Sequence, residues 1–186
     1  MLSSERLESA GNGKLDSLTP GDKSPLHAMS VDVEDYFHVA ALSSVIRRDQ
    51  WDSLPSRVQE NTERLLSLFD NHNVKATFFV LGWVAERFPH LVRNLSDHGH
   101  EIASHGYSHQ LVYRQSPEVF REETIRSKRI IEDIIGKPVE GYRAASYSIT
   151  KESLWALDVL GEVGFTWDSS IFPIRHDRYG IPGSPS

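Results

Sequence analysis

Short apolar runs alternate along this chain with longer stretches that carry their apolar residues on one helical face. The short runs predict buried strands, because runs of this length that are rich in β-formers suit a covered sheet. They lie at 27–33, 74–80, 139–143 and 165–168, with another that starts at 101. The longer stretches repeat apolar residues three or four positions apart, which predicts amphipathic helices. They lie at 56–71, 89–97, 117–135 and 151–163, with a further short helix around 40–47.

The predicted elements follow one another as strand and helix in strict alternation. Such an order gives parallel strands joined by right-handed crossovers, in an α/β barrel or an open α/β sheet. Polar residues gather after the strands, which favours the barrel, whose sites lie at the carboxyl ends of its strands. Ser116 and Pro117 start the longest helix as N-cap and first residue, and Gly136 ends it.

Length and composition fit one soluble domain, since the chain has 186 residues, of which 25% are charged. Residues 1–26 are polar and lack an apolar period, so we expect a disordered leader before one ordered domain at 27–186. The net charge of −6 disfavours nucleic acid and anionic membranes as partners, and the absence of cysteine excludes disulfides and thiolate metal sites. No membrane span or signal peptide is visible in the sequence, which makes the cytoplasm the default location. The oligomeric state stays open.

Four of the predicted strands end in unusual polar residues. The first ends in Asp32, Glu34 and Asp35, and the third leads to His105 and His109. The other two end in the segments 143–147 and 168–170, which hold an arginine, a tyrosine, an aspartate and several serines. Two histidines and a carboxylate with an open fourth position are the ligand set of a catalytic zinc site. Taken alone, the histidine pair occurs by chance in many proteins, and the acids suit a helix cap equally well.

Several of these segments resemble the polysaccharide deacetylase family, the NodB homology domain of carbohydrate esterase family 4. The motifs that carry the resemblance read ATFFVLG at 76–82, GHEIASH at 99–105 and GYSH at 106–109. The resemblance covers roughly residues 29–173. The opening SVDVEDYF at 30–37 is similar to one subgroup, which is associated with exopolysaccharide loci and exosortase-type protein sorting (PEP-CTERM).

The resemblance implies a deformed (β/α) barrel that removes acetyl groups from an N-acetylhexosamine polymer with the help of a divalent metal, most simply Zn²⁺. Asp32 is then the base that deprotonates the attacking water, and Arg143 holds Asp32 through a charge-assisted hydrogen bond. His105 and His109 are metal ligands. The roles of the remaining site residues follow from the same resemblance: an oxyanion contact from the backbone N–H at Tyr147, and an acetyl pocket lined by Asp168 and Ser169. Aromatic residues such as Tyr36 and Tyr107 would stack on sugar faces or belong to the core.

The chain departs from the family pattern at two places. Where the family has adjacent aspartates, Val33 follows Asp32, so the third ligand is either Glu34 or Asp35. Strand geometry favours Glu34, because residues two apart share a face of a strand. The second departure is the Leu-x-His motif that normally supplies the general acid. Nothing after Asp168 matches it, and we therefore expect a barrel that is incomplete at its C-terminal end.

Three functions remain open on these grounds. A metal-dependent polysaccharide deacetylase is the leading hypothesis. Some relatives of this barrel hydrolyse a small amide or a cyclic ureide, which gives a second enzymatic hypothesis. The missing general acid supports a third, a non-catalytic protein that binds metal and carbohydrate, because loss of such an acid typically slows a reaction ~100- to 10,000-fold.

Overall fold

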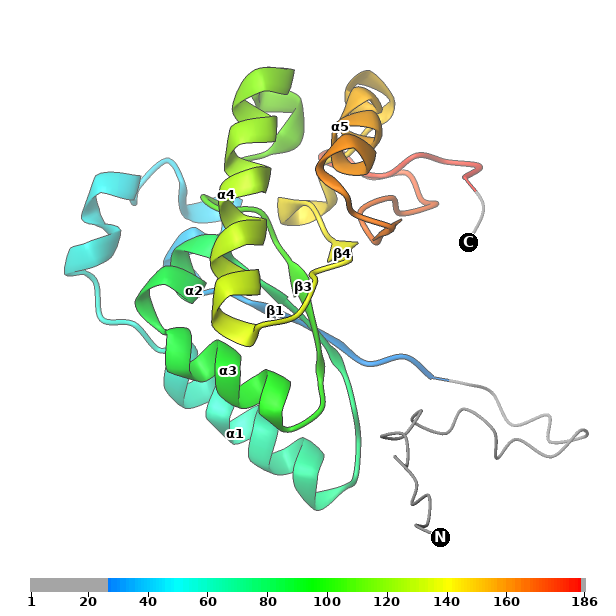
Figure 1. Ribbon diagram of the computed structural model, residues 1–186. Coiled ribbons are helices and arrows are strands. Elements are labelled where there is room, and N and C mark those ends of the chain that lie inside the picture. Colours follow the sequence, from blue (N-terminus) through cyan, green and yellow to red (C-terminus); the bar gives the residue numbers. More distant parts are fainter. Residues whose placement is uncertain (1–26, 185–186) are drawn as a thin grey trace, which may run out of the picture.

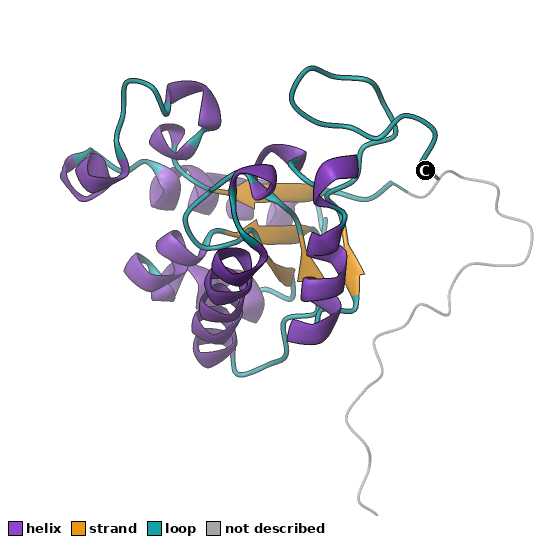
Figure 2. Cartoon of the chain, turned by 90° about the horizontal axis from the view of Figure 1, so that it is seen from above, coloured by secondary structure: helices purple, strands orange, loops and turns teal. Residues whose placement is uncertain are grey.

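Five parallel strands form one sheet in the computed structural model, which describes residues 27–184. The strands stand in the sheet in their sequence order, each paired with the next. They are β1 (Ser30–Val33), β2 (Thr77–Val80), β3 (Glu101–Ser104), β4 (Gly141–Tyr142) and β5 (Trp167–Asp168). Sequential parallel order is that of a (β/α) barrel segment, and the predicted α/β fold is confirmed. Figure 2 shows the strands side by side with helices around them.

Within residues 27–184, five α-helices lie in the segments between these strands. They are α1 (Val58–Asn71), α2 (Gly82–Arg87), α3 (Pro89–Asp97), α4 (Pro117–Ile135) and α5 (Trp155–Val163). The longest helix, α4, packs against α2, α3 and α5 and runs upright through the centre of Figure 1. Its capping residues act as predicted: the Ser116 side chain accepts a hydrogen bond from the N–H of Val119, and Gly136 adopts a left-handed conformation with φ of 67°.

Two local predictions were wrong. The segment 40–47, where a short helix was expected, holds one 3₁₀ turn, Ala40–Leu42, and a second, Arg48–Ser53, follows it. The hydroxyl of Ser43 donates to the carbonyl of Ala40 at 2.8 Å, a local bond that competes with α-helical hydrogen bonding. The second is α2, a helix that the sequence does not predict. A helix of six residues is too short to show a period in the sequence.

The two faces of the sheet have different roles. Phe78 packs on Phe69 of α1, with ring centroids 6.1 Å apart, on the helix-covered face. Its neighbour Phe79 points the other way and contacts the ring of Trp167, 5.7 Å away. Trp167 lies directly over Gly141, where a Cβ would come within 2.0 Å of the indole, so only glycine fits at this position of β4. Asp32 is in register with Phe79, which places the acid on the same, inner face.

Residues 1–26, the expected leader, lie outside the described part of the chain. Among the residues that are described, no helix combines the length and the apolar character needed to cross a lipid bilayer.

Candidate metal centre

The carboxyl ends of β1 and β3 bring three metal-ligating side chains together. Glu34 directly follows β1, and His105 directly follows β3. Each of Glu34, His105 and His109 offers a ligand atom within 4.8 Å of the others'. His105 and His109 are buried, whereas the Glu34 side chain keeps 20% of its surface exposed. A site of this kind is closed by protein on one side and open to solvent on the other.

Backbone contacts with the start of α2 fix the loop that carries the two histidines. The N–H of Gly82 donates to the carbonyl of Gly106 at 2.7 Å, and the N–H of Trp83 donates to that of Tyr107 at 3.1 Å. Gly106 has φ of 74° and His109 has φ of 51°, both in the left-handed region. A non-glycine residue there costs on the order of 1 kcal/mol or more and is typical of functional sites. This turn brings the second imidazole back toward the first.

Hydrogen bonding leaves one nitrogen of His105 available as a ligand. Nδ1 of His105 lies 2.8 Å from the carbonyl oxygen of Arg143 and must carry the proton to donate to it. The lone pair is then on Nε2. Burial lowers the pKa of His105, which keeps the ring neutral at physiological pH. A neutral imidazole with its second nitrogen held by a carbonyl is the state in which histidine binds metals.

Glu34 faces the same point as His109 without a hydrogen bond between them. Oε2 of Glu34 lies 2.8 Å from Nε2 of His109, at ion-pair distance, and this buried oxygen has no hydrogen-bond partner in the described part of the molecule. Burial is the largest single influence on the pKa of Glu34 and raises it, but His109, His105 and His38 together bring the pKa below its usual value. A buried carboxylate oxygen without a donor, next to two imidazoles, fits a divalent cation.

Asp35, the alternative ligand, has another role. Its buried carboxylate accepts hydrogen bonds from the hydroxyl of Ser56 at 2.6 Å and from the N–H groups of Arg57 at 2.8 Å and Val58 at 3.2 Å. These N–H groups lie at the start of α1, so Asp35 satisfies the free donors of that helix. The cluster of ligand atoms contains Glu34 and not Asp35.

Arg143 joins the base candidate to the rest of the site. Its Nη1 donates to Oδ1 of Asp32 at 2.8 Å and to the hydroxyl of Ser30 at 3.1 Å, and its Nη2 donates to Oγ of Ser169 at 3.0 Å. The guanidinium also lies 3.8 Å from the ring centroid of Phe79. Ser30 was not singled out in the sequence, although it stands two positions before Asp32 and therefore shares its face of β1.

Two further predicted residues lie near Arg143 in different arrangements. The ring of Tyr147 is 5.4 Å from the guanidinium carbon, but its N–H donates to the carbonyl of Ala144 at 3.0 Å. The structure therefore does not present this N–H free for an oxyanion. Asp168 accepts from the N–H of Ser170 at 2.8 Å and from its hydroxyl at 2.5 Å, and burial raises the pKa of Asp168.

The two tyrosines expected to contact sugar lie apart from the ligand cluster. The hydroxyl of Tyr107 donates to Glu86 at 2.7 Å, and the guanidinium of Arg126 covers its ring at 3.7 Å. These contacts hold Tyr107 between α2 and α4, and they anchor the histidine loop to both helices. Tyr36 is 39% exposed, and the guanidinium of Arg57 lies 5.3 Å from its ring centroid.

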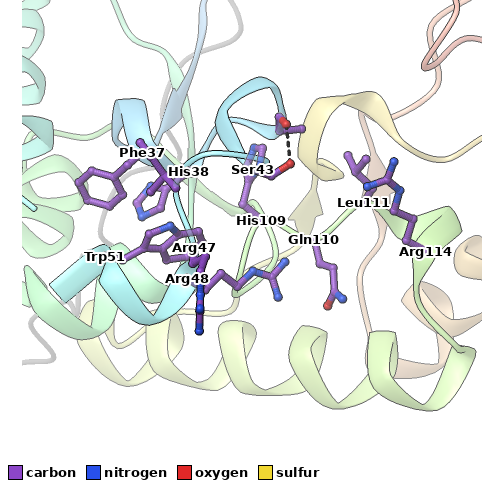
Figure 3. A pocket seen from close by; sticks show the side chains of 12 residues that line it. Phe37, His38, Ser43, Arg47, Arg48, Trp51, His109, Gln110, Leu111 and Arg114 are labelled. Carbon is purple, nitrogen blue, oxygen red and sulfur yellow. Dashed lines mark hydrogen bonds between the residues drawn. The ribbon is translucent and has the colours of Figure 1, made fainter. Parts of the chain in front are cut away.

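A cavity of about 330 Å³ opens beside His109 (Figure 3). One wall holds aromatic side chains from the segment after β1, and the other comes from the segment after the histidine loop. The labelled lining residues include Phe37, His38, Arg47, Arg48, Trp51, Gln110 and Arg114. Burial lowers the pKa of His38 to about 4, so this ring is neutral. Apart from Phe37, which ends the motif at 30–37, no sequence motif marked these residues, because they come from turns without a period.

Comparison with known proteins finds relatives of this chain in sequence. A sequence model described as "Polysaccharide deacetylase" matches residues 50–165, more than half of the chain. The matched range includes His105, His109 and Arg143, whereas Asp32 and Glu34 precede it. A peptidoglycan-N-acetylglucosamine deacetylase of Bacillus cereus is 34% identical over 100 residues, which are 53% of this chain and 36% of that protein. A chitooligosaccharide deacetylase of Bradyrhizobium is 31% identical over 99 residues, which are 53% of this chain and 43% of that protein.

The fold has a counterpart among solved structures. A crystal structure from Mycobacterium smegmatis, described as that of a polysaccharide deacetylase, superposes with a TM-score of 0.64 at 28% identity. The superposition covers 77% of this chain and 50% of the other. The chain thus spans less than half the length of the curated relatives it matches, and its five strands correspond to part of a NodB-type (β/α) barrel.

Proposed function

Because the chain belongs to the polysaccharide deacetylase family, we propose that it hydrolyses the N-acetyl groups of an N-acetylated polysaccharide. The observation that carries the proposal is the pairing of Asp32 with Arg143 at the same sheet edge as Glu34, His105 and His109. The relatives named above act on peptidoglycan and on chitooligosaccharides. The resemblance of residues 30–37 to the exopolysaccharide-associated subgroup favours an exopolysaccharide as the polymer.

Glu34, His105 and His109 would hold a divalent metal, and we assign Zn²⁺ because two imidazoles and one carboxylate suit it best. When bound, such a cation polarises a carbonyl and lowers the pKa of water from ~15.7 toward ~7. The backbone carbonyl of Arg143 accepts the hydrogen bond from Nδ1 of His105, and so it orients the ring and leaves Nε2 as the ligand atom.

Asp32 is the group that takes the proton from the attacking water. Arg143, itself held by Ser30, fixes the carboxylate with Nη1 2.8 Å from Oδ1, which leaves Oδ2 free of this contact. A base that is already held in one orientation loses less entropy in reaching the geometry for proton transfer. The departing amine needs a proton on its nitrogen. Asp32 can supply the proton that it took from the water.

Acetate release from chitohexaose by the purified protein tests this proposal. With zinc added we expect acetate and free amine in equal amounts, and with a chelator we expect neither. Asp32→Asn is the matched variant, because it keeps the shape of the side chain and removes its ability to act as a base. We expect it to bind zinc normally and to lose activity ~100- to 10,000-fold.

Other outcomes would select the competing functions. Bound zinc and bound sugar without any acetate would show a non-catalytic carbohydrate-binding protein. Hydrolysis of a cyclic ureide, with the polymer left untouched, would show a small-amide hydrolase.

A further inference from the structure

The cavity beside His109 is lined by arginines, and we propose that it binds a negatively charged sugar unit of the polysaccharide. The inference rests on the proposed function, because it takes the ligand to be the polymer that carries the acetamide. It goes further by assigning that polymer an acidic group, such as a uronate carboxylate, close to the acetylated unit.

The charge of the lining supports an anionic ligand. Arg47, Arg48 and Arg114 line the cavity, and no aspartate or glutamate does. Arg47 forms an ion pair with Asp49, whose carboxylate oxygens lie 3.2 and 2.5 Å from its Nε and Nη2. Within residues 27–184, neither Arg48 nor Arg114 has a carboxylate oxygen within 4.0 Å. Two cationic groups therefore face the cavity without a protein counter-charge, in a chain whose net charge is −6.

The position of the cavity connects it to the reaction site. His109 and Gln110 form part of its wall, and His109 is also a member of the ligand cluster. A volume of about 330 Å³ lies in the usual range for small-molecule sites, ~300–1,000 Å³. A sugar unit in this cavity would thus be a near neighbour of the unit whose acetamide reaches Asp32.

Two buried donors in the aromatic wall lack acceptors. The N–H of Asp35 donates to Nδ1 of His38 at 2.8 Å, so the proton of this ring is on Nε2. Nε2 of His38 and Nε1 of Trp51 are both buried and have no hydrogen-bond partner among the described residues. Buried donors without partners are rare and point to an acceptor that the chain itself does not supply. Sugar hydroxyls and carboxylates are such acceptors.

A second cavity continues the basic surface away from the ligand cluster. It measures about 370 Å³ and shares Arg114 and Leu111 with the first. It adds Arg178 and Tyr113, together with one acid, Asp177. Arginine side chains thus follow one another along a path that is open to solvent. Such a path suits a polymer with repeated negative charges better than a single small anion.

Binding measurements without metal test the proposal independently of turnover. The two probes are a hyaluronan hexasaccharide, in which N-acetylglucosamine alternates with glucuronate, and chitohexaose, which carries the acetamides alone. Isothermal titration in the presence of a chelator gives both affinities for the wild-type chain. We expect the anionic probe to bind at least about 10-fold more tightly near 50 mM salt, and most of that difference to vanish near 500 mM salt.

Three variants locate the effect. Arg48→Gln and Arg114→Gln should each weaken binding of the hyaluronan probe about 5-fold, with a smaller effect on chitohexaose. Arg93→Gln removes an exposed arginine of α3 that does not line the cavity, and it should change neither affinity. Equal affinities of the wild-type chain for the two probes would overturn the proposal. So would a loss in Arg93→Gln as large as that in the cavity variants, because net charge would then explain the binding.

The outcome is separable from that of the proposed function. If the wild-type chain releases acetate but shows no preference for the anionic probe, the cavity assignment fails and the deacetylase assignment stands. If the preference and its loss in the variants are found without any acetate release, the cavity assignment stands and the catalytic one fails.

Discussion

Arg143 serves both halves of the site from one position. Its guanidinium holds Asp32, Ser30 and Ser169, and its backbone carbonyl accepts the hydrogen bond that orients His105. The fork of an arginine can bind two groups in fixed directions, whereas a lysine presents one compact charge. The residue therefore fixes the carboxylate of Asp32 through its side chain and the tautomer of His105 through its backbone.

Replacing this arginine by lysine should separate the two roles. We expect Arg143→Lys to lower kcat for acetate release about 10- to 100-fold, because the rigid guanidinium that fixes the direction of the Asp32 carboxylate is lost. Zinc affinity should change little, since the carbonyl that holds His105 is retained. Arg129→Lys, on the exposed face of α4, is the matched control. Wild-type kcat in Arg143→Lys would contradict the role of the guanidinium.

The sequence predicts which polar side chains gather at the strand ends. It does not predict which atoms each of these side chains contacts. Asp32, His105 and His109 stand at strand ends or in the turns that follow, and such positions converge in any parallel sheet. The choice between Glu34 and Asp35 depended on where β1 ends and on which carboxylate the N–H groups at the start of α1 approach. Both depend on the tertiary structure. The expected oxyanion contact from the N–H of Tyr147 depended on local folding in the same way. In the structure this N–H donates to the carbonyl of Ala144 in a local turn.

At the scale of elements, α2 supports the loop that carries the histidines. Its first residue, Gly82, lies so close to that loop that a Cβ would stand 2.8 Å from Cδ2 of Tyr107 and 2.9 Å from Oγ of Ser127. The hydroxyl of Ser127 on α4 donates to the carbonyl of Gly106 at 2.9 Å, so the same contact also fixes the loop. The close approach of α2, α4 and the loop thus depends on the absence of a side chain at position 82.

Gly82→Ala should therefore disturb stability and metal binding together. We expect a loss of ~1–3 kcal/mol in the free energy of unfolding, measured by urea denaturation, and a weaker affinity for zinc. Gly161→Ala in α5 is the control, because nothing lies within 4 Å of its Cβ position. Alanine in a helix interior should stabilise the chain there by ~0.5–1 kcal/mol. Equal effects at the two positions would contradict the role assigned to α2.

The helices that the sequence predicted well are those with strong local determinants. α3 and α4 begin at a proline in the first turn, and α4 has a serine cap before it. α2 has neither a capping side chain nor the length to show a period, and it forms because it packs against α3 and α4. Local sequence signals thus define where α3 and α4 begin, whereas α2, the short helix beside the site, depends on tertiary packing.

At the scale of the whole molecule, the ligand cluster joins two parts of the sheet that are distant in sequence. Glu34 follows β1, and His105 and His109 follow β3, with β2 between these strands. A cation bound by all three would connect segments some seventy positions apart in the sequence. Ligands that bind only the folded state stabilise it by mass action.

Zinc should therefore raise the melting temperature of the wild-type chain. At about 100 times the dissociation constant the stabilisation is ~2.7 kcal/mol, which corresponds to an increase of several degrees for a domain of this size. A chelator should reverse the increase. Magnesium, which prefers oxygen ligands in octahedral geometry, is the control cation and should have little effect. A rise with magnesium as large as that with zinc would point to nonspecific screening of charge.

The central claim is that Glu34, and not Asp35, binds a metal ion together with His105 and His109. Zinc binding by variants at these two neighbouring positions tests it most directly. Glu34→Gln and Asp35→Asn each remove one negative charge at adjacent positions, so general electrostatics affects them alike. Equilibrium dialysis followed by elemental analysis gives the zinc bound per folded chain. We expect the wild-type chain and Asp35→Asn to bind one ion each, and Glu34→Gln to lose at least about 100-fold in affinity. Retention of zinc by Glu34→Gln, with loss in Asp35→Asn, would contradict the assigned metal centre.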